Sequence, residues 1–254
     1  MAVSLPQIVT PEYTIQLKSI KAPVRYRPYL VKEEKILLTA KESGDPNDVE
    51  HAVRQILRAC TFNQIDIDKL PSFDIEYLFL QLRAKSVNNV TELQYECRNM
   101  VREESERASP DDDGRCHGTV KVAVNLDEIQ IQVPEGHTNL IPITDDITLE
   151  MQYPTLSLLQ DVMANNPESL SSIAKVVARC IKSVCEKDGT VHEMFGVPEE
   201  EQIAFVESLT MSQLEKVQVF FSTMPALHHK VPFKCEKCGY TETLHFRGLM
   251  DFFD

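Results

Sequence analysis

Apolar residues follow a helical period in the first part of the chain. Between residues 49 and 60 they recur at i, i+3, i+4, i+7, i+8 and i+11, which predicts one amphipathic helix. The stripe consists of Val49, Ala52, Val53, Ile56, Leu57 and Cys60. Because free cysteine is among the most buried residue types, we expect Cys60 to be a small core residue.

Two more helices flank this one. The first begins near Leu30 and ends before the turn at residues 43–46, and the other follows Ser72, which we expect to be its N-cap. Apolar residues cover most sides of the helix after Ser72, so it belongs at the centre of the fold. Two short strands, over residues 13–17 and 24–27, precede all three helices.

The period then changes to two. Apolar residues alternate with polar ones over residues 120–126, 129–133 and 147–151, and this alternation is typical of half-buried strands. We therefore predict an antiparallel sheet within residues 91–152, inserted between helical parts.

The helical period returns after residue 155. A stripe from Leu170 to Val184 predicts a helix that carries Cys180 and Cys185. Five residues turn a helix by about 140°, so these two cysteines could not hold one ion together. Thr210 and Gln213 form the pattern of a capping box, which predicts a helix that ends at Pro225.

Composition limits the classes of function. The formal net charge of −13 and the isoelectric point near 5.0 argue against nucleic acid as a partner, because phosphate binding depends on clustered lysine and arginine. No apolar run has the length of a membrane span, and the first residues lack a secretory signal. Seven scattered cysteines favour a reducing cytoplasm.

One short motif specifies chemistry by its spacing. Cys235 and Cys238 are three positions apart and are followed by Gly239, an arrangement that directs two sulfurs at one soft cation, usually Zn²⁺. The alternative is a redox dithiol, but such a motif normally opens a helix, whereas residues 239–244 continue as a strand. The sequence therefore predicts a structural zinc ion.

A closed zinc site needs two more ligands. Cys97 and Cys116 are our first choice, because each lies at a strand end beside the polar loop that separates them. The alternatives are four histidines, His117, His228, His229 and His245. Cys97 and Cys116 could also be sheet cysteines without a ligand role.

These patterns predict an α+β fold: a mostly helical scaffold with an inserted antiparallel β-sheet and a C-terminal zinc-ribbon-like hairpin. We divide it into residues 1–90, 91–153, 154–226 and 227–254, packed as one compact unit. Signatures of a zinc protease helix, a nucleophile elbow or a phosphate loop are missing, so we expect no catalysis.

The last residues form an apolar, partly aromatic end: Leu249, Met250, Phe252 and Phe253. They could fold back into the core or dock in a groove of another protein, since a short aromatic end is an efficient anchor. We expect them to be the partner-binding residues.

Several stretches together resemble the T4-type bacteriophage baseplate protein family, which includes baseplate hub subunits and hub assembly factors. The similar stretches are residues 24–28, 31–38, 73–86, 220–225, 235–239 and 248–253. The resemblance covers nearly the whole chain, and its motifs are typical of a scaffold rather than of an enzyme.

This resemblance implies a protein of phage tail morphogenesis. It would bind baseplate hub or wedge proteins in the cytoplasm of the infected host, either as an assembly factor or as a structural subunit kept in the virion baseplate. A generic zinc-ribbon adaptor, or less readily a thiol redox protein, is the alternative from another class.

Overall fold

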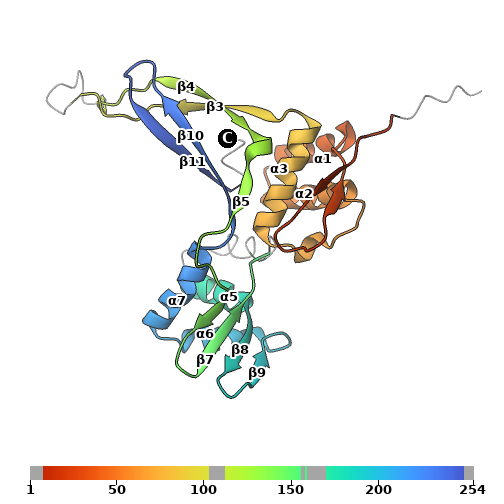
Figure 1. The fold of residues 1–254 in the computed structure, drawn as a ribbon, viewed down its shortest axis with the longest axis vertical. Coiled ribbons are helices and arrows are strands. Elements are labelled where there is room, and N and C mark those ends of the chain that lie inside the picture. The colour runs from red at the N-terminus through yellow and green to blue at the C-terminus, as the bar shows by residue number, and fades with distance from the viewer. Residues whose placement is uncertain (1–7, 103–111, 156–157, 159–169, 249–254) are drawn as a thin grey trace, which may run out of the picture.

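The computed structural model describes residues 8–102, 112–155, 158 and 170–248. Their buried side chains form three cores, and the molecule is elongated (Figure 1). We name its regions the N-terminal part (residues 8–88), the hairpin part (β3, β4, β5, β10 and β11) and the four-stranded part (β6 to β9 with α5, α6 and α7).

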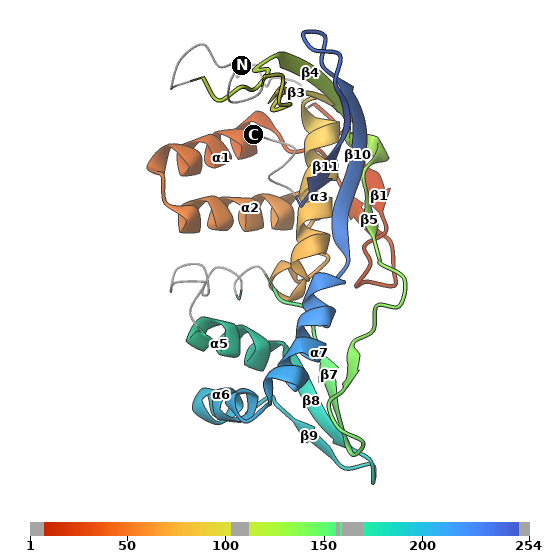
Figure 2. The ribbon, with the colours of Figure 1, turned by 90° about the vertical axis from the view of Figure 1, so that its left-hand side faces the viewer.

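The N-terminal part pairs a short hairpin with three helices. Its elements are β1 (Tyr13–Ile15), β2 (Val24–Tyr26), α1 (Val31–Ser43), α2 (Pro46–Cys60), a short 3-10 helix (Ile67–Lys69) and α3 (Ser72–Ser86). Figure 2 shows α1 and α2 side by side, both approaching α3 from one side. The predicted strands and helices are confirmed here, and Cys60 is fully buried in this core.

Polar contacts fix the ends of these helices. Glu33 accepts a hydrogen bond from the backbone N–H of Leu30 at 2.7 Å and pairs with Arg27 at 3.0 Å. Asp74, fully buried in α3, accepts hydrogen bonds from the backbone N–H groups of Lys18 and Ser19. The prediction that Ser72 caps α3 is wrong: Pro71 holds that position, and its carbonyl accepts hydrogen bonds from the first turn.

The hairpin part consists of two antiparallel sheets around one core. β3 (Val90–Glu96) pairs with β4 (Thr119–Asn125), and the second sheet has the order β11-β10-β5. Its strands are β5 (Gln130–Gln132), β10 (Ala226–Lys234) and β11 (Thr241–Arg247). The inner faces of both sheets and one side of α3 share this core, to which Leu93, Val122, Leu227 and Phe246 contribute.

The four-stranded part is a sheet packed against helices. Its strand order is β6-β7-β8-β9, and all pairs are antiparallel. The strands are β6 (Leu140–Pro142), β7 (Ile147–Met151), β8 (Ile181–Glu186) and β9 (Val191–Glu193); the helices are α5 (Leu170–Cys180), α6 (Glu199–Glu207) and α7 (Met211–Ser222). The predicted capping box of Thr210 and Gln213 is confirmed at the start of α7.

Two predictions about helices and strands beyond residue 90 are wrong. The expected helix to Val184 ends at Cys180, because Ile181 and Ser183 are buried against β7 while Lys182 between them is exposed. Cys185 therefore lies on β8, and Cys180 and Cys185 do not share a helix. The chain continues from α5 into β8 without a loop.

The expected single sheet within residues 91–152 is also wrong. Its strands are distributed over three sheets: β3 and β4 pair together, β5 joins β10, and β6 and β7 join β8. A short 3-10 helix (Leu126–Glu128) separates β4 from β5 and redirects the chain toward the C-terminal hairpin. The α+β class holds, with several small sheets in place of one.

His137 connects the hairpin part with the four-stranded part. Its ring nitrogens lie 2.9 Å from Thr223 Oγ1 and 2.9 Å from the hydroxyl of Tyr153. Tyr153 in turn packs against Phe73 and against Phe220, with ring centroids 5.0 and 5.5 Å apart. This small polar and aromatic group is the joint between the two cores.

Candidate metal centre

Cys235 and Cys238 lie in the turn between β10 and β11. Cys235 donates its backbone N–H to the Tyr240 carbonyl at 2.8 Å, and Gly239 donates to the Cys235 carbonyl at 2.8 Å. Gly239 has a φ of +75°, a backbone conformation that glycine adopts without a steric penalty. These bonds hold both sulfurs on one side of the turn.

Cys97 and Cys116 lie at the matching end of the other hairpin. Cys97 follows β3 and donates its N–H to the Gly118 carbonyl at 2.7 Å, while Cys116 precedes β4 and donates to the Asn99 carbonyl at 2.9 Å. The ladder between β3 and β4 thus continues to the two cysteines. Residues far apart in sequence are fixed next to each other.

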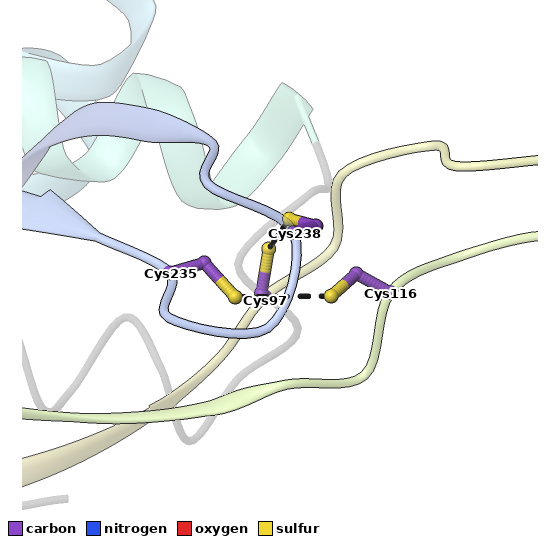
Figure 3. A group of neighbouring side chains, drawn as sticks. All are labelled: Cys97, Cys116, Cys235 and Cys238. Atoms are coloured by element: carbon purple, nitrogen blue, oxygen red, sulfur yellow. Dashed lines mark hydrogen bonds between the residues drawn. The ribbon is translucent and has the colours of Figure 1, made fainter.

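The four sulfurs converge on one point (Figure 3). The Sγ atoms of Cys97 and Cys238 are 3.7 Å apart, as are those of Cys116 and Cys235, and all four lie within 4.8 Å of one another. A tetrahedral zinc ion with Zn–S bonds of about 2.3 Å needs S–S separations of about 3.8 Å. The observed group has nearly this spacing, so its geometry and its thiol donors fit Zn²⁺.

Backbone amides also prepare the sulfurs for negative charge. The N–H groups of Asn99, Gly118 and Tyr240 bond to the sulfurs of Cys97, Cys116 and Cys238, in each case two residues earlier. Hydrogen bonds to a thiolate stabilise it. The Tyr240 N–H is the largest of the effects that together lower the pKa of Cys238 to about 7.

Burial and crowding oppose this charge at the other positions. Although the Asn99 N–H favours the thiolate of Cys97, burial and the neighbouring thiols raise the pKa of Cys97 to about 12. Burial, followed by the neighbouring Cys238, raises the pKa of Cys116. All four groups could be thiolates only with a cation at their centre, and a divalent ion such as Zn²⁺ would supply that charge.

Gly118 is a residue that the sequence reasoning missed. A Cβ at this position would lie 2.8 Å from the sulfur of Cys235 and 3.3 Å from that of Cys116, so only glycine leaves room for both. Lys237 also supports the group, since its Nζ donates to the Cys116 carbonyl at 2.6 Å. The available signal was the glycine two residues after Cys116, which resembles the glycine after Cys238.

Histidine does not complete the site in the described residues, where the clustered ligand group contains four cysteines. The ring of His117 bonds to Glu96 and Asp113, and His228 and His245 lie against each other on the outer face of the hairpin. Cys60, Cys180 and Cys185 lie outside the group. The first choice of Cys97 and Cys116 is the pair that the structure brings to Cys235 and Cys238.

The C-terminal residues Leu249, Met250, Phe252 and Phe253 lie outside the described residues. Their predicted role in partner binding stays a prediction. In the described part of the chain, no helix is long and apolar enough to cross a membrane.

The family described as T4 bacteriophage base plate protein matches residues 10–254. The chain belongs to this family of T4-type baseplate proteins. The resemblance seen in the sequence is thereby confirmed, over nearly the whole chain.

A relative of this baseplate protein is known from Enterobacteria phage T4. The two are 25% identical over 244 residues, which covers 96% of this chain and 98% of the relative, described as baseplate hub assembly protein gp26. No solved structure matches the chain.

Proposed function

We propose that this baseplate protein is an assembly factor of the phage baseplate, which binds hub or wedge proteins while the baseplate forms. The observation that carries the proposal is the end-to-end match to the T4 hub assembly protein, over 96% of one chain and 98% of the other. A match of this extent covers nearly all of this sequence and of the relative, rather than one shared module. The protein would act in the host cytoplasm during infection.

We further propose that Cys97, Cys116, Cys235 and Cys238 bind one structural Zn²⁺. The ion would join the turn ends of two hairpins that belong to separate sheets in the described residues, and so fix the shape of the hairpin part. Small sheets of two and three strands gain little stability alone, so a metal link has a large effect on them. This role supports binding and involves no reaction.

The proposal also covers the C-terminal end. Leu249, Met250, Phe252 and Phe253 would anchor the partner, because large apolar and aromatic side chains bury a large area for few residues.

Quantitative mass spectrometry during infection tests the assembly role. Peptides of the protein should co-purify with baseplate intermediates and should be missing from washed, complete virions. If they persist in virions in amounts comparable to hub subunits, the protein is a structural subunit of the baseplate. If they are found with neither, the baseplate role itself is wrong.

Point variants test the anchor in the same assay. Changing Phe252 and Phe253 to serine should abolish co-purification with baseplate intermediates. The matched control is Phe195→Ser, since Phe195 lies in the four-stranded part and is 97% exposed. Equal co-purification by both variants would contradict the anchor role.

A further inference from the structure

A cleft lies between the two sheets of the hairpin part, beside the cysteine group. Its volume is about 530 Å³, and it is lined by residues 119–123 of β4, by residues 231–234 of β10 and by Glu236. Figures 1 and 2 show β4 and β10 leading to the same end of the molecule, where the cysteines join them. At the other end of β10, β5 pairs with it through residues 226–228.

The edge of β4 that faces this cleft is an unpaired strand edge. Two hydrogen bonds at 2.7 Å, from Cys97 to the Gly118 carbonyl and from Leu126 to the Asn89 carbonyl, show which residues of β4 bond to β3. Because pairing alternates along an antiparallel strand, Val120, Val122 and Val124 bond to β3. The N–H and C=O groups of Thr119, Lys121 and Ala123 therefore point the other way, and no backbone partner for them exists among the described residues.

The facing edge of β10 is open but interrupted. The bonds from Cys235 to the Tyr240 carbonyl and from Gly248 to the Leu227 carbonyl show that odd-numbered residues of β10 bond to β11. Lys230, Pro232 and Lys234 consequently direct their backbone toward the cleft, and Pro232 has no N–H to offer there. The edge of β4 is thus the complete template for another strand.

The side chains at the cleft determine what such a strand would contain. Val122 and Phe233 are buried between the sheets, so every second residue of an added strand would meet apolar side chains. On the outer face, Lys121 and Lys234 are exposed and form no ion pair with any described residue. Glu236 is the one acidic lining residue. Glu92 and Glu96 lie on β3, one strand farther from the cleft, and Glu96 bonds to His117.

The outer face of β10 and β11 extends this positive charge. Lys230 and Lys234 alternate with Pro232 on β10, opposite His245, Thr243 and Thr241 of β11, and no acidic side chain lies on this face of the two strands. In a protein with a net charge of −13, such a basic face is a local exception. It favours acidic side chains in whatever binds beside it.

We propose that the cleft binds an extended segment of a partner protein, with alternating apolar and acidic residues, as an additional strand on β4. Main-chain hydrogen bonds to Thr119, Lys121 and Ala123 supply affinity, and the lysines supply selectivity. The inference rests on the proposed function and names the kind of partner segment that this assembly factor recognises. A nucleic acid fits poorly, because the net charge repels it and the one lining aromatic, Phe233, is buried.

Amide hydrogen exchange measured by NMR on the full-length protein tests this proposal. The probe is a ten-residue peptide of alternating valine and glutamate. Its addition should slow exchange at Lys121 and Ala123 at least tenfold, because their N–H groups gain a bond, and should leave Val120 and Val122 almost unchanged, because theirs already bond to β3.

Charge variants test the selectivity by fluorescence anisotropy with the same peptide. Lys121→Glu with Lys234→Glu should weaken binding about tenfold, since two exposed ion pairs become repulsive contacts. The matched control, Lys35→Glu with Lys41→Glu, changes the net charge equally at exposed positions of α1 and should bind as the wild type does. Lys121→Pro should abolish binding, because it removes the Lys121 N–H, which faces the cleft. This N–H makes no hydrogen bond to β3, so the pairing of β3 with β4 loses no bond.

Three outcomes would overturn the proposal. They are no added protection at Lys121 and Ala123 with millimolar peptide, equal binding of a peptide of alternating valine and lysine, and binding that occurs only after residues 249–254 are removed. The last outcome would assign the cleft to the chain's own end. Since the probe contains no phage protein, none of these results would contradict the baseplate role.

Discussion

The hairpin part and the four-stranded part cover the buried face of their sheets in different ways. Both consist of short antiparallel strands with one buried face, and both need something to cover that face. In the four-stranded part, α5, α6 and α7 cover the sheet with apolar side chains such as Val177, Val217 and Phe220. In the hairpin part, two small sheets cover each other beside α3, and four cysteines join their ends.

The difference shows that the alternation of apolar and polar residues in a strand does not reveal which elements cover the buried face of its sheet. Helices α5 and α7 of the four-stranded part are visible in the sequence as apolar stripes, whereas the link in the hairpin part is visible only as cysteine spacing. If zinc is bound as proposed, the hairpin part depends on a metal and the four-stranded part does not. The largest changes in stability are therefore expected from variants that remove the metal from the hairpin part or truncate the apolar core of the four-stranded part.

Removal of one cysteine ligand should have the largest effect. In Cys235→Ser the metal would be lost, and metal-binding free energies on the order of 10 kcal/mol are coupled to folding in small zinc domains. We expect the hairpin part to unfold, with zinc content falling from one ion per chain to none. Elemental analysis and amide exchange of β3, β4, β10 and β11 would measure both changes.

The matched control truncates the other core. Phe220 is almost fully buried in the four-stranded part, so Phe220→Ala should cost about 3–5 kcal/mol of unfolding free energy without loss of zinc. A chelator should then destabilise this variant and the wild type alike in the hairpin part. Zinc-free protein with undiminished protection in β10 and β11 would show that the four thiols need no metal.

The replacement Gly118→Ala should have an intermediate effect. The added Cβ would lie 2.8 Å from the sulfur of Cys235, so the sulfur must move, at a cost of about 1–3 kcal/mol. Zinc affinity measured by competition with a chelator should fall accordingly. Gly136→Ala is the control for zinc affinity: its Cβ meets no atom within 4 Å, and the positive φ costs about 1–2 kcal/mol at a site far from the sulfurs. Unchanged affinity in Gly118→Ala would mean that the sulfurs are not held as described.

The smallest effect concerns pH and the joint between the two regions. Burial lowers the pKa of His137 below its ordinary value of about 6.5, so the unfolded chain takes up a proton at a higher pH than the folded protein does. Stability should therefore be complete at pH 8 and should decline as the pH falls below about 6.5. His137→Gln, which does not titrate, should lose less stability over this interval.

Urea unfolding between pH 8 and pH 5 would measure this difference. Its sign is definite: the wild type loses more stability than His137→Gln as the pH decreases. If the unfolding free energy of the two proteins falls equally with decreasing pH, the protonation of His137 does not affect stability. Because its ring is partly exposed, the effect should stay below that of Gly118→Ala.

The sequence predicted much of this molecule wherever the evidence was local. The stripe from Val49 to Cys60, the capping box at Thr210 and the turn at Gly239 each depend on neighbours within a few residues. Cys97 and Cys116 could be chosen because both adjoin the same loop. The proposed division at residues 90, 153 and 226 stays a prediction.

Long-range pairing was beyond this reasoning. The alternation over residues 129–133 predicts a strand but not its partner, which is β10, almost a hundred residues later. Ile181 and Val184 are three positions apart, which fits the period of a helix and not that of a regular strand. The structure buries both on β8 because the register with β7 shifts between Glu150 and Met151. The position of Gly118 two residues after Cys116 was visible in the sequence, but its contact with the sulfur of Cys235 was not, because only the tertiary structure brings the two together.

The four cysteines can come together only late in synthesis. Their two close sulfur pairs join residues that are 119 and 141 positions apart in the chain. At roughly 5–20 residues per second, a ribosome needs on the order of ten seconds to progress from Cys116 to Cys238. Until then the first two thiols have no partners, while the helices of the N-terminal part already have their full sequence. A filled site would therefore mark a chain whose translation has passed residue 238, and fragments that end earlier could not acquire it.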